Sequence, residues 1–171
     1  TRFIVRNSSN NSLFDINTLN QSNRPNLRDG NWHHILAIWD GTTNTNGAKI
    51  FFDGVLRALG TSNVLTPRND SSIPTRAGSS VSDKDFIGKQ SNQQIWNTAL
   101  TYGSASADGD VAGGEVATIY NGGKPYTGTQ PQAANLKGWW KMNIDTSNWD
   151  GSDWQIGETP VSYTHLRAHE T

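Results

Sequence analysis

The sequence predicts an all-β fold, an antiparallel β-sandwich with one short helix near residues 115–121. Three observations support this prediction. The 171 residues include 18 Asn and 17 Gly but only 3 Glu, a composition that favours turns and strands over long helices. The pair Asp53-Gly54 separates two strand-like runs, which is a strong hairpin signal. Short apolar runs also alternate with turn residues along the chain, as is typical of sandwiches and jelly rolls.

Residues 31–59 are expected to form a three-stranded antiparallel meander. Period-two alternation over residues 31–39 places apolar side chains on both faces, which predicts a central strand covered on both sides, at least in its second half. A polar loop then leads to a second strand at 49–52. The Asp-Gly turn connects this strand to a third one at 55–59.

The remaining elements are short. Segment 60–84 is rich in Ser, Thr, Asn and Pro and holds one edge strand at most, and residues 102–114 form a loop without periodicity. One helix is expected from Glu115 to Asn121, followed by Gly122 as its stop signal. Further strands are expected at 2–6, 12–16, 85–88, 93–97 and 136–142. Four tryptophans lie in strand patterns and are expected in the core: Trp32, Trp39, Trp96 and Trp139.

The two ends of the chain suggest a fragment. Residues 161–171 read VSYTHLRAHET, which is one translated frame of a common transposase-type sequencing adapter. We expect this tail to be non-biological and exclude it from reasoning about the fold. The chain starts at Thr1 within a predicted strand, so we expect a piece of a larger multimodule protein. Its predicted organisation is a domain over residues 1–145, a linker or the start of a next module at 146–160, and the tail.

Charge and composition exclude several classes of protein. The net charge is -1 and no basic cluster is present, which argues against binding of nucleic acid through its phosphates. No apolar run is long enough for insertion into a membrane. The chain has no Cys, so disulfide scaffolds and cysteine metal sites are excluded.

The residues that could carry catalysis are sparse, and we expect no enzyme. Retaining glycosidases need two carboxyl groups about 5 Å apart. Outside the tail the chain has only Glu115 and Glu158, and neither has an acidic partner four or five residues on. His33 and His34 are neighbours on a predicted strand, so their side chains point to opposite faces and cannot chelate one ion together. We expect one of them to be buried and hydrogen-bonded and the other to lie near a loop.

A few residues are candidates for binding. Trp149 and Trp154 lie in a polar segment, where an exposed ring can stack on a sugar. Trp39 and Asp40, at the junction of a strand and a loop, are further candidates for ligand binding, although Trp39 fits the core and Asp40 fits a turn. The remaining candidates are metal ligands. The run Asp108-Gly109-Asp110 is similar to the start of a calcium loop without its later ligands and closing Glu.

An ordered series of motifs runs through the chain. It starts with DGNWHHI at 29–35 and continues with WDG at 39–41 and FDG at 52–54. FIG at 86–88, IWNTALT at 95–101 and EVATIYNGG at 115–123 follow, and 136–142 has the pattern of a tryptophan-rich closing strand. In this order the motifs resemble the laminin-G-like domains of the concanavalin A-like lectin/glucanase superfamily.

The resemblance implies a concanavalin A-like jelly roll over roughly residues 1–145. Relatives usually have about three strands before the point where this chain starts, so the jelly roll is expected to be N-terminally incomplete. Residues 102–114 would be an inserted loop, and calcium would be the usual ion.

The resemblance also implies a function. We expect a non-catalytic module that binds a glycan or a protein surface, or serves adhesion, within a larger phage structural or bacterial surface protein. Its location would be extracellular, on a virion or a cell surface. Two alternatives are a purely structural spacer or packing domain of a fibre, and a fragment of a glycan-active enzyme that lacks its catalytic strand.

Overall fold

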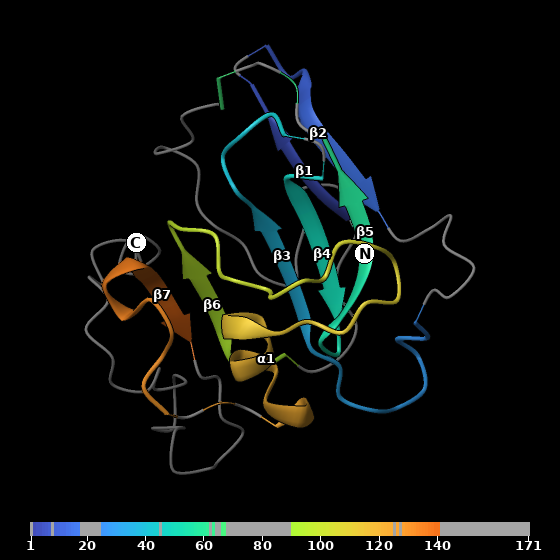
Figure 1. The fold of residues 1–171 in the computed structure, drawn as a ribbon, viewed down its shortest axis with the longest axis vertical. Helices are drawn as coiled ribbons and strands as arrows, with labels where there is room; N and C mark the ends of the chain where they lie inside the picture. The colour runs from blue at the N-terminus through green and yellow to red at the C-terminus, as the bar shows by residue number, and fades with distance from the viewer. Residues whose placement is uncertain are drawn as a thin grey trace, which may run out of the picture. The chain divides into compact units, whose positions relative to one another are not determined.

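A computed structural model shows how the elements are arranged (Figure 1). It describes residues 2–7, 9–17, 25–44, 46–61, 63, 66–67, 90–124, 126 and 128–140. The chain divides into two compact units, and each is described by itself. The first unit comprises Thr1–Asn69 and Thr98–Ala133, and the second comprises Asp70–Asn97 and Ala134–Thr171.

The first unit is built on a three-stranded antiparallel sheet. Its strands are β3 (Ile35–Trp39), β4 (Ala48–Phe52) and β5 (Val55–Gly60), in the spatial order β3-β4-β5. The expected meander is therefore confirmed. Asp53 and Gly54 form the turn between β4 and β5 with φ values of 49° and 73°, the left-handed conformation that an Asp-Gly hairpin turn requires.

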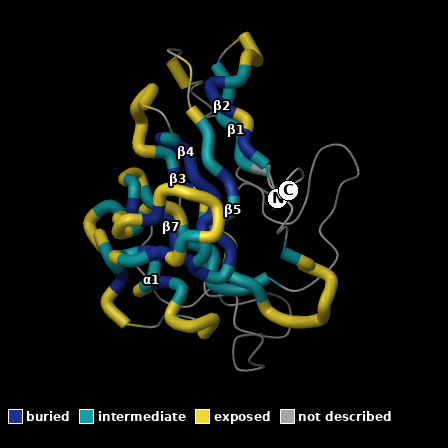
Figure 2. Tube along the Cα trace, turned by 45° about the vertical axis from the view of Figure 1, so that its right-hand side comes forward, coloured by how far each residue is buried: buried dark blue, intermediate teal, exposed yellow. Residues whose placement is uncertain are grey.

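The prediction that residues 31–39 form a central strand, covered on both faces at least in its second half, is wrong. Among the described strands β3 lies at the edge of the sheet, and Ile35 and Ala37 leave one of its faces exposed. The central strand is β4, all five of whose residues are buried (Figure 2). Strand β3 starts only at Ile35, which is 45% exposed. It starts late because the Asp53 carboxylate accepts the His34 backbone N–H at 2.8 Å, which takes this donor out of the strand ladder.

A hairpin covers one face of this sheet. It consists of β1 (Arg2–Arg6) and β2 (Ser12–Asn17), which pair antiparallel. Buried side chains of β2 pack against alternate residues of β4 and form the main core, with Phe3, Val5 and Trp39 at its edge. We call this side of the sheet the hairpin face. The residues of this core are Leu13, Phe14, Ile16, Ala48, Ile50, Phe52 and Ala58.

The segment before the helix covers the opposite side of the sheet, which we call the loop face. The Phe51 ring on this face lies 6.0 Å from the Tyr102 ring, centroid to centroid. The backbone N–H of Leu56 donates to Asp110 O at 2.8 Å, and Gly109 N–H donates to Leu56 O at 2.9 Å. The segment thus runs beside the free edge of β5 and shields it (Figure 1). Capping a strand edge in this way blocks pairing with other chains.

Helix α1 (Gly114–Tyr120) confirms the expected helix, one residue earlier than predicted. Its start is held by a reciprocal pair: Glu115 N–H donates to Thr101 Oγ1 at 3.1 Å, and Thr101 N–H donates to Glu115 Oε2 at 2.8 Å. This pairing satisfies helix N–H groups as a capping box does, but across distant residues. Asn121 ends the helix in the left-handed conformation, with Gly122 also at positive φ.

The second unit contains an antiparallel pair of strands, β6 (Gln93–Trp96) and β7 (Leu136–Trp140). Trp139 of β7 is 7% exposed, and its indole N–H donates to Asn92 Oδ1 at 2.6 Å. The predicted strands at 93–97 and 136–142 are confirmed in their described parts. The predicted strand at 85–88 and most of segment 60–84 lie outside the described residues.

The antiparallel pairing of all described strands and the single short α-helix among the described residues agree with the predicted concanavalin A-like β-sandwich. Two further helical turns are 3-10 helices, η1 (Asn121–Gly123) and η2 (Ala133–Asn135). Across the part of the chain that the structure describes, no helix is long and apolar enough to cross a membrane.

Candidate functional site

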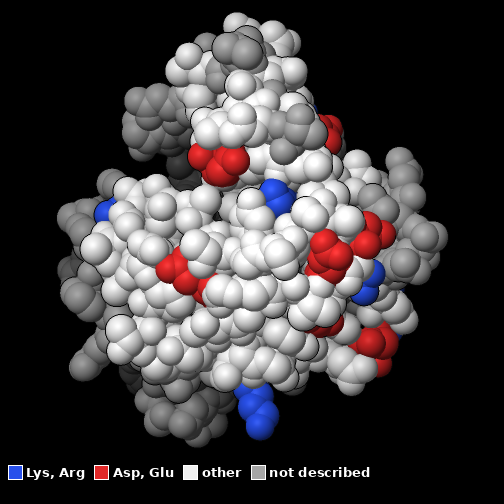
Figure 3. All heavy atoms as spheres, viewed as in Figure 1, with Lys and Arg blue, Asp and Glu red and all other residues white. Residues whose placement is uncertain are grey.

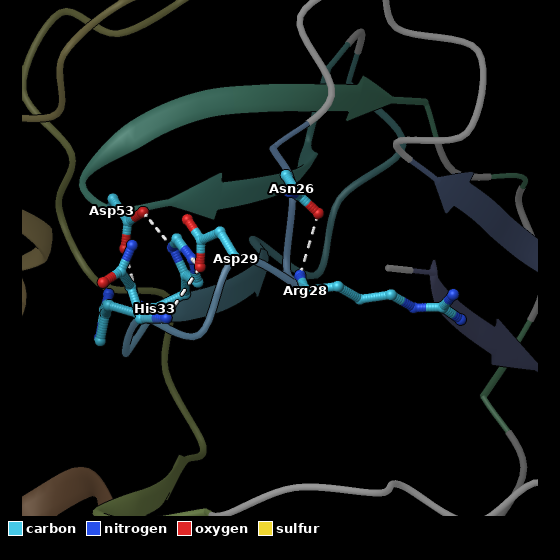
Figure 4. A network of polar contacts seen from close by, with 7 residues as sticks. Asn26, Arg28, Asp29, His33 and Asp53 are labelled. Atoms are coloured by element: carbon cyan, nitrogen blue, oxygen red, sulfur yellow. Dashed lines mark hydrogen bonds and ion pairs between the residues drawn. The ribbon is translucent and has the colours of Figure 1, made fainter.

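Two polar arrangements lie in the first unit, at opposite ends of β4. At the Asp53 end, His33 bridges two carboxylates (Figure 4). Its Nδ1 lies 2.8 Å from Asp53 Oδ2 and its Nε2 lies 3.0 Å from Asp29 Oδ1. Asp53 also accepts the His34 N–H, and Asp29 accepts the Asn31 N–H at 2.9 Å.

The electrostatics of this cluster favour a charged imidazole. Hydrogen bonds to Asp53 and Asp29 raise the pKa of His33 above its ordinary value. The Asn31 backbone N–H, together with the His33 ring, lowers the pKa of Asp29 to about 2. When protonated, the ring donates one N–H to each carboxylate. Both ring nitrogens are thereby occupied, so the cluster acts as a brace that ties the segment before β3 to the β4–β5 turn.

The two histidines divide the expected roles differently from the prediction. His33 makes the side-chain hydrogen bonds and lies beside the loop before β3, whereas the His34 ring packs 5.8 Å from the Tyr120 ring, centroid to centroid. Both histidines are partly buried. Burial lowers the pKa of His34. The His34 Nδ1 atom has no hydrogen-bond partner among the described residues.

At the other end of β4 lies a pocket of about 270 Å³ on the loop face. It forms between the loop that joins β3 to β4 and the start of the segment before the helix. Its lining comprises Asn46, Lys49, Tyr102 and residues 103–106. The walls therefore combine an amide, an ammonium group, a phenol ring and two serines, which is a polar pocket with one aromatic side.

Lys49 is the unusual group in this pocket. It is only 5% exposed and is the second residue of β4, a strand that is buried at every position. Its ammonium group donates to the backbone carbonyl of Asn46 and lies 4.5 Å from the centre of the Tyr102 ring, a cation–π distance. Within the described part of the chain no carboxylate forms an ion pair with it.

Asp108 and Asp110 shape the segment that lines this pocket. Asp110 Oδ2 accepts the backbone N–H groups of Ser106 and Ala107, each at 2.8 Å, and these bonds lower its pKa. Asp108 lies 3.7 Å from the Arg57 guanidinium. No group of three His, Cys, Asp or Glu side chains that could hold a metal exists among the described residues. A calcium ion at Asp108 and Asp110 would have to compete with these protein contacts.

The structure does not bring Trp39 or Asp40 into the pocket. Trp39 packs on the hairpin face, 5.5 Å from Phe14, and its indole N–H donates to Thr42 O. Asp40 stabilises the loop after β3 by accepting the N–H and the hydroxyl of Thr42 at 2.8 and 2.7 Å. Trp149 and Trp154 lie outside the described residues.

The expectation that Trp32 belongs to the core is wrong. Its side chain is 57% exposed, because the chain before β3 is held by the His33 brace and has left the sheet. Trp139 is buried as expected, and Trp39 and Trp96 are partly buried.

Sequence reasoning did not single out Lys49 or Tyr102. A signal for Lys49 was present, since a lone lysine stands in the apolar run Ala48-Lys49-Ile50-Phe51-Phe52. Tyr102 had no such signal, because it opens a segment without periodicity and reaches β4 only through the tertiary fold.

The comparisons with known proteins agree with this architecture. A family model, Laminin_G_3, described as the concanavalin A-like lectin/glucanases superfamily, matches residues 1–104. No curated protein and no solved structure showed a significant match. The expected extension of the domain to residue 145 stays a prediction. The match spans well over half of the chain and includes all strands of the first unit, so this chain belongs to the concanavalin A-like lectin/glucanase superfamily.

Proposed function

We propose that this chain is a non-catalytic module that binds carbohydrate through the pocket on the loop face. The superfamily is one of lectin-like and glucanase-like domains, and in such folds function lies in sites on the scaffold rather than in the scaffold itself. The observation that carries the proposal is the pocket lining, where amide, hydroxyl and ammonium groups surround an aromatic ring. Sugars offer hydroxyl groups and apolar C–H faces that suit such a lining.

Three acidic side chains, in the segment that lines the pocket and at the start of the helix, support binding over cleavage. Asp110 is used to order the backbone at residues 106–107, and Asp108 pairs with Arg57. Glu115 is likewise engaged, with Thr101 and with the Gln132 amide at 2.7 Å. A glycosidase needs one carboxyl group free to protonate the leaving group and another facing it, and these three carboxylates are already committed to structural contacts.

The wider setting of the module follows from the family resemblance. We propose that it works outside the cell, on a virion or a cell surface, as one module of a larger chain that contacts glycans or proteins. Charged side chains of both signs are scattered among the described residues in Figure 3. The net charge of -1 does not favour contact with nucleic acid or anionic membranes.

A glycan array with the whole chain, with and without added calcium, tests the proposal. The matched variants are Ser104→Trp, which places a large ring at an exposed wall of the pocket, and Thr66→Trp at an exposed position outside it. We expect binding to a set of glycans that Ser104→Trp weakens about ten-fold or more, while Thr66→Trp leaves it intact.

Two results would contradict the proposal. Absence of binding to every glycan in both buffers would refute carbohydrate recognition and favour the structural spacer. Equal binding by both tryptophan variants would show that the pocket is not the site. Loss of binding without calcium would show that calcium is required.

A further inference from the structure

We infer that the pocket selects a sugar residue that carries a carboxylate, such as a uronic acid, with Lys49 as the residue that recognises the acid. This inference rests on the proposed function and names the ligand class of the same pocket. It starts from the cost of burying a charge. A buried ammonium group is unfavourable unless charge partners or several hydrogen bonds compensate it.

The contacts of Lys49 compensate this charge only in part. The ammonium group has three N–H donors. One donates to the carbonyl of Asn46, and the positive charge also rests over the Tyr102 ring. Neither contact supplies a full negative charge. Lys49 lines the pocket, so an acidic group that enters it meets a cation that needs little further desolvation.

The neighbours of Lys49 hold it in place. On the sheet, Phe51 of the same strand packs against Tyr102 and keeps the ring beside the ammonium group. Asp110 orders the segment that lines the pocket by accepting the Ser106 and Ala107 N–H groups. The Asp110 carboxylate is therefore engaged with backbone N–H groups.

The size and charge of the pocket favour one carboxylate over larger anions. Its volume of about 270 Å³ lies just below the usual range of roughly 300–1,000 Å³ for pockets that bind small molecules, which suits one sugar ring. Lys49 offers one positive charge as a point, which balances one carboxylate. A phosphate carries more charge and is better matched by an arginine fork or by several cations.

Calorimetry with three small probes tests the inference on the whole chain. The probes are methyl β-D-glucuronide, methyl β-D-glucoside and glucose 6-phosphate, of which the first two differ only at the carboxylate. We expect the glucuronide to bind about ten-fold or more tightly than the glucoside, as the gain of a hydrogen bond between charged groups implies. Lys49→Met replaces the apolar stem of the side chain without its ammonium group and should abolish this preference, while Lys49→Arg should retain part of it.

A second variant keeps the test decisive if Lys49→Met does not fold. Ser104→Asp places a carboxylate at the exposed wall of the pocket, where it should compete for Lys49 and selectively reduce glucuronide binding. Thr66→Asp is its control of equal charge outside the pocket.

Three outcomes separate this inference from the proposed function. Equal affinity for glucoside and glucuronide would overturn the acidic preference and leave carbohydrate binding standing. Tighter binding of glucose 6-phosphate would overturn the choice of a carboxylate. Absence of binding to every sugar, here and on the glycan array, would overturn both.

Discussion

At the scale of single residues, several polar side chains of this domain form hydrogen bonds that hold the backbone of loops and turns in place. Asp53 shows this most clearly, because it turns the chain, accepts the His34 backbone N–H and holds the His33 ring. A left-handed aspartate that also accepts two hydrogen bonds is hard to replace. Asn tolerates the backbone conformation but lacks the charge that His33 uses.

The His33 brace predicts a specific pH dependence of stability. The pKa of His33 is raised in the folded state by Asp53 and Asp29, so folding is stabilised fully below the ordinary value of 6.5, and this stabilisation is lost as pH rises through the raised value. We expect the melting temperature of the wild type to fall more between about pH 5 and about pH 9 than that of His33→Gln.

His34 is the internal control for this experiment. Burial lowers its pKa, so its own contribution has the opposite sign and is lost as pH falls through the ordinary histidine range. Both proteins keep His34, and the difference between their melting curves therefore isolates His33. If the melting temperatures of the wild type and His33→Gln change in parallel with pH, protonation of the His33 ring does not contribute to stability. A second loss near pH 2 to 4 is expected from Asp29, whose pKa is lowered to about 2 by Asn31 and His33. This loss should be smaller in His33→Gln, because that variant keeps Asn31 but lacks the His33 ring.

At the scale of elements, the contact of β2 with β5 depends on the absence of a side chain. A Cβ atom at Gly60 would lie 2.0 Å from Ile16 Cγ2, far inside van der Waals contact. Gly60→Ala should therefore destabilise the domain by about 1–3 kcal/mol, as overpacking of a core does. Urea unfolding followed by Trp fluorescence measures this loss.

A double-mutant cycle identifies the cause. Ile16→Ala removes the clashing methyl group and is itself costly, by roughly 2–5 kcal/mol. If the clash is the cause, the double variant is more stable than the sum of the two single losses predicts. Strict additivity would show that Gly60 is needed for another reason.

At the scale of the whole molecule, stability should be highest along β4. This strand is buried at every position and has strand neighbours on both sides, and amides in such positions open only when the domain unfolds. In hydrogen exchange followed by NMR, we expect the amides of Ile50 and Phe51 to exchange more slowly than those of the β3–β4 loop by several orders of magnitude. Comparable rates in the two places would contradict the central position of β4.

Some elements of this fold can be predicted from neighbouring residues in the sequence, and others cannot. The β4–β5 hairpin follows from Asp53-Gly54, and helix α1 follows from Val116, Ile119 and the residues that stop it, because turns and helices depend on neighbours in sequence. The late start of β3 and the exposure of Trp32 could not be predicted in this way. Alternation along a strand shows which side chains share a face. It does not show whether another layer of the protein covers that face.

The candidate site shows the same limit more strongly. Lys49 is visible in the sequence as a charge within an apolar strand, but Tyr102 is 53 positions further on and meets it only after folding. The Thr101–Glu115 pair that starts the helix is likewise formed by residues of separate segments.

From its sequence alone, this protein is a β-domain of the concanavalin A-like superfamily with a meander, an Asp-Gly hairpin and one helix. Backbone preferences, turn chemistry and side-chain periodicity act over a few residues and can be followed along the chain. Tertiary structure decided which strand is central, that the segment before the helix lies on one face of the sheet, and that a buried lysine borders a pocket there. Burial and pocket shape depend on contacts between distant residues, and these exist only once the chain has folded.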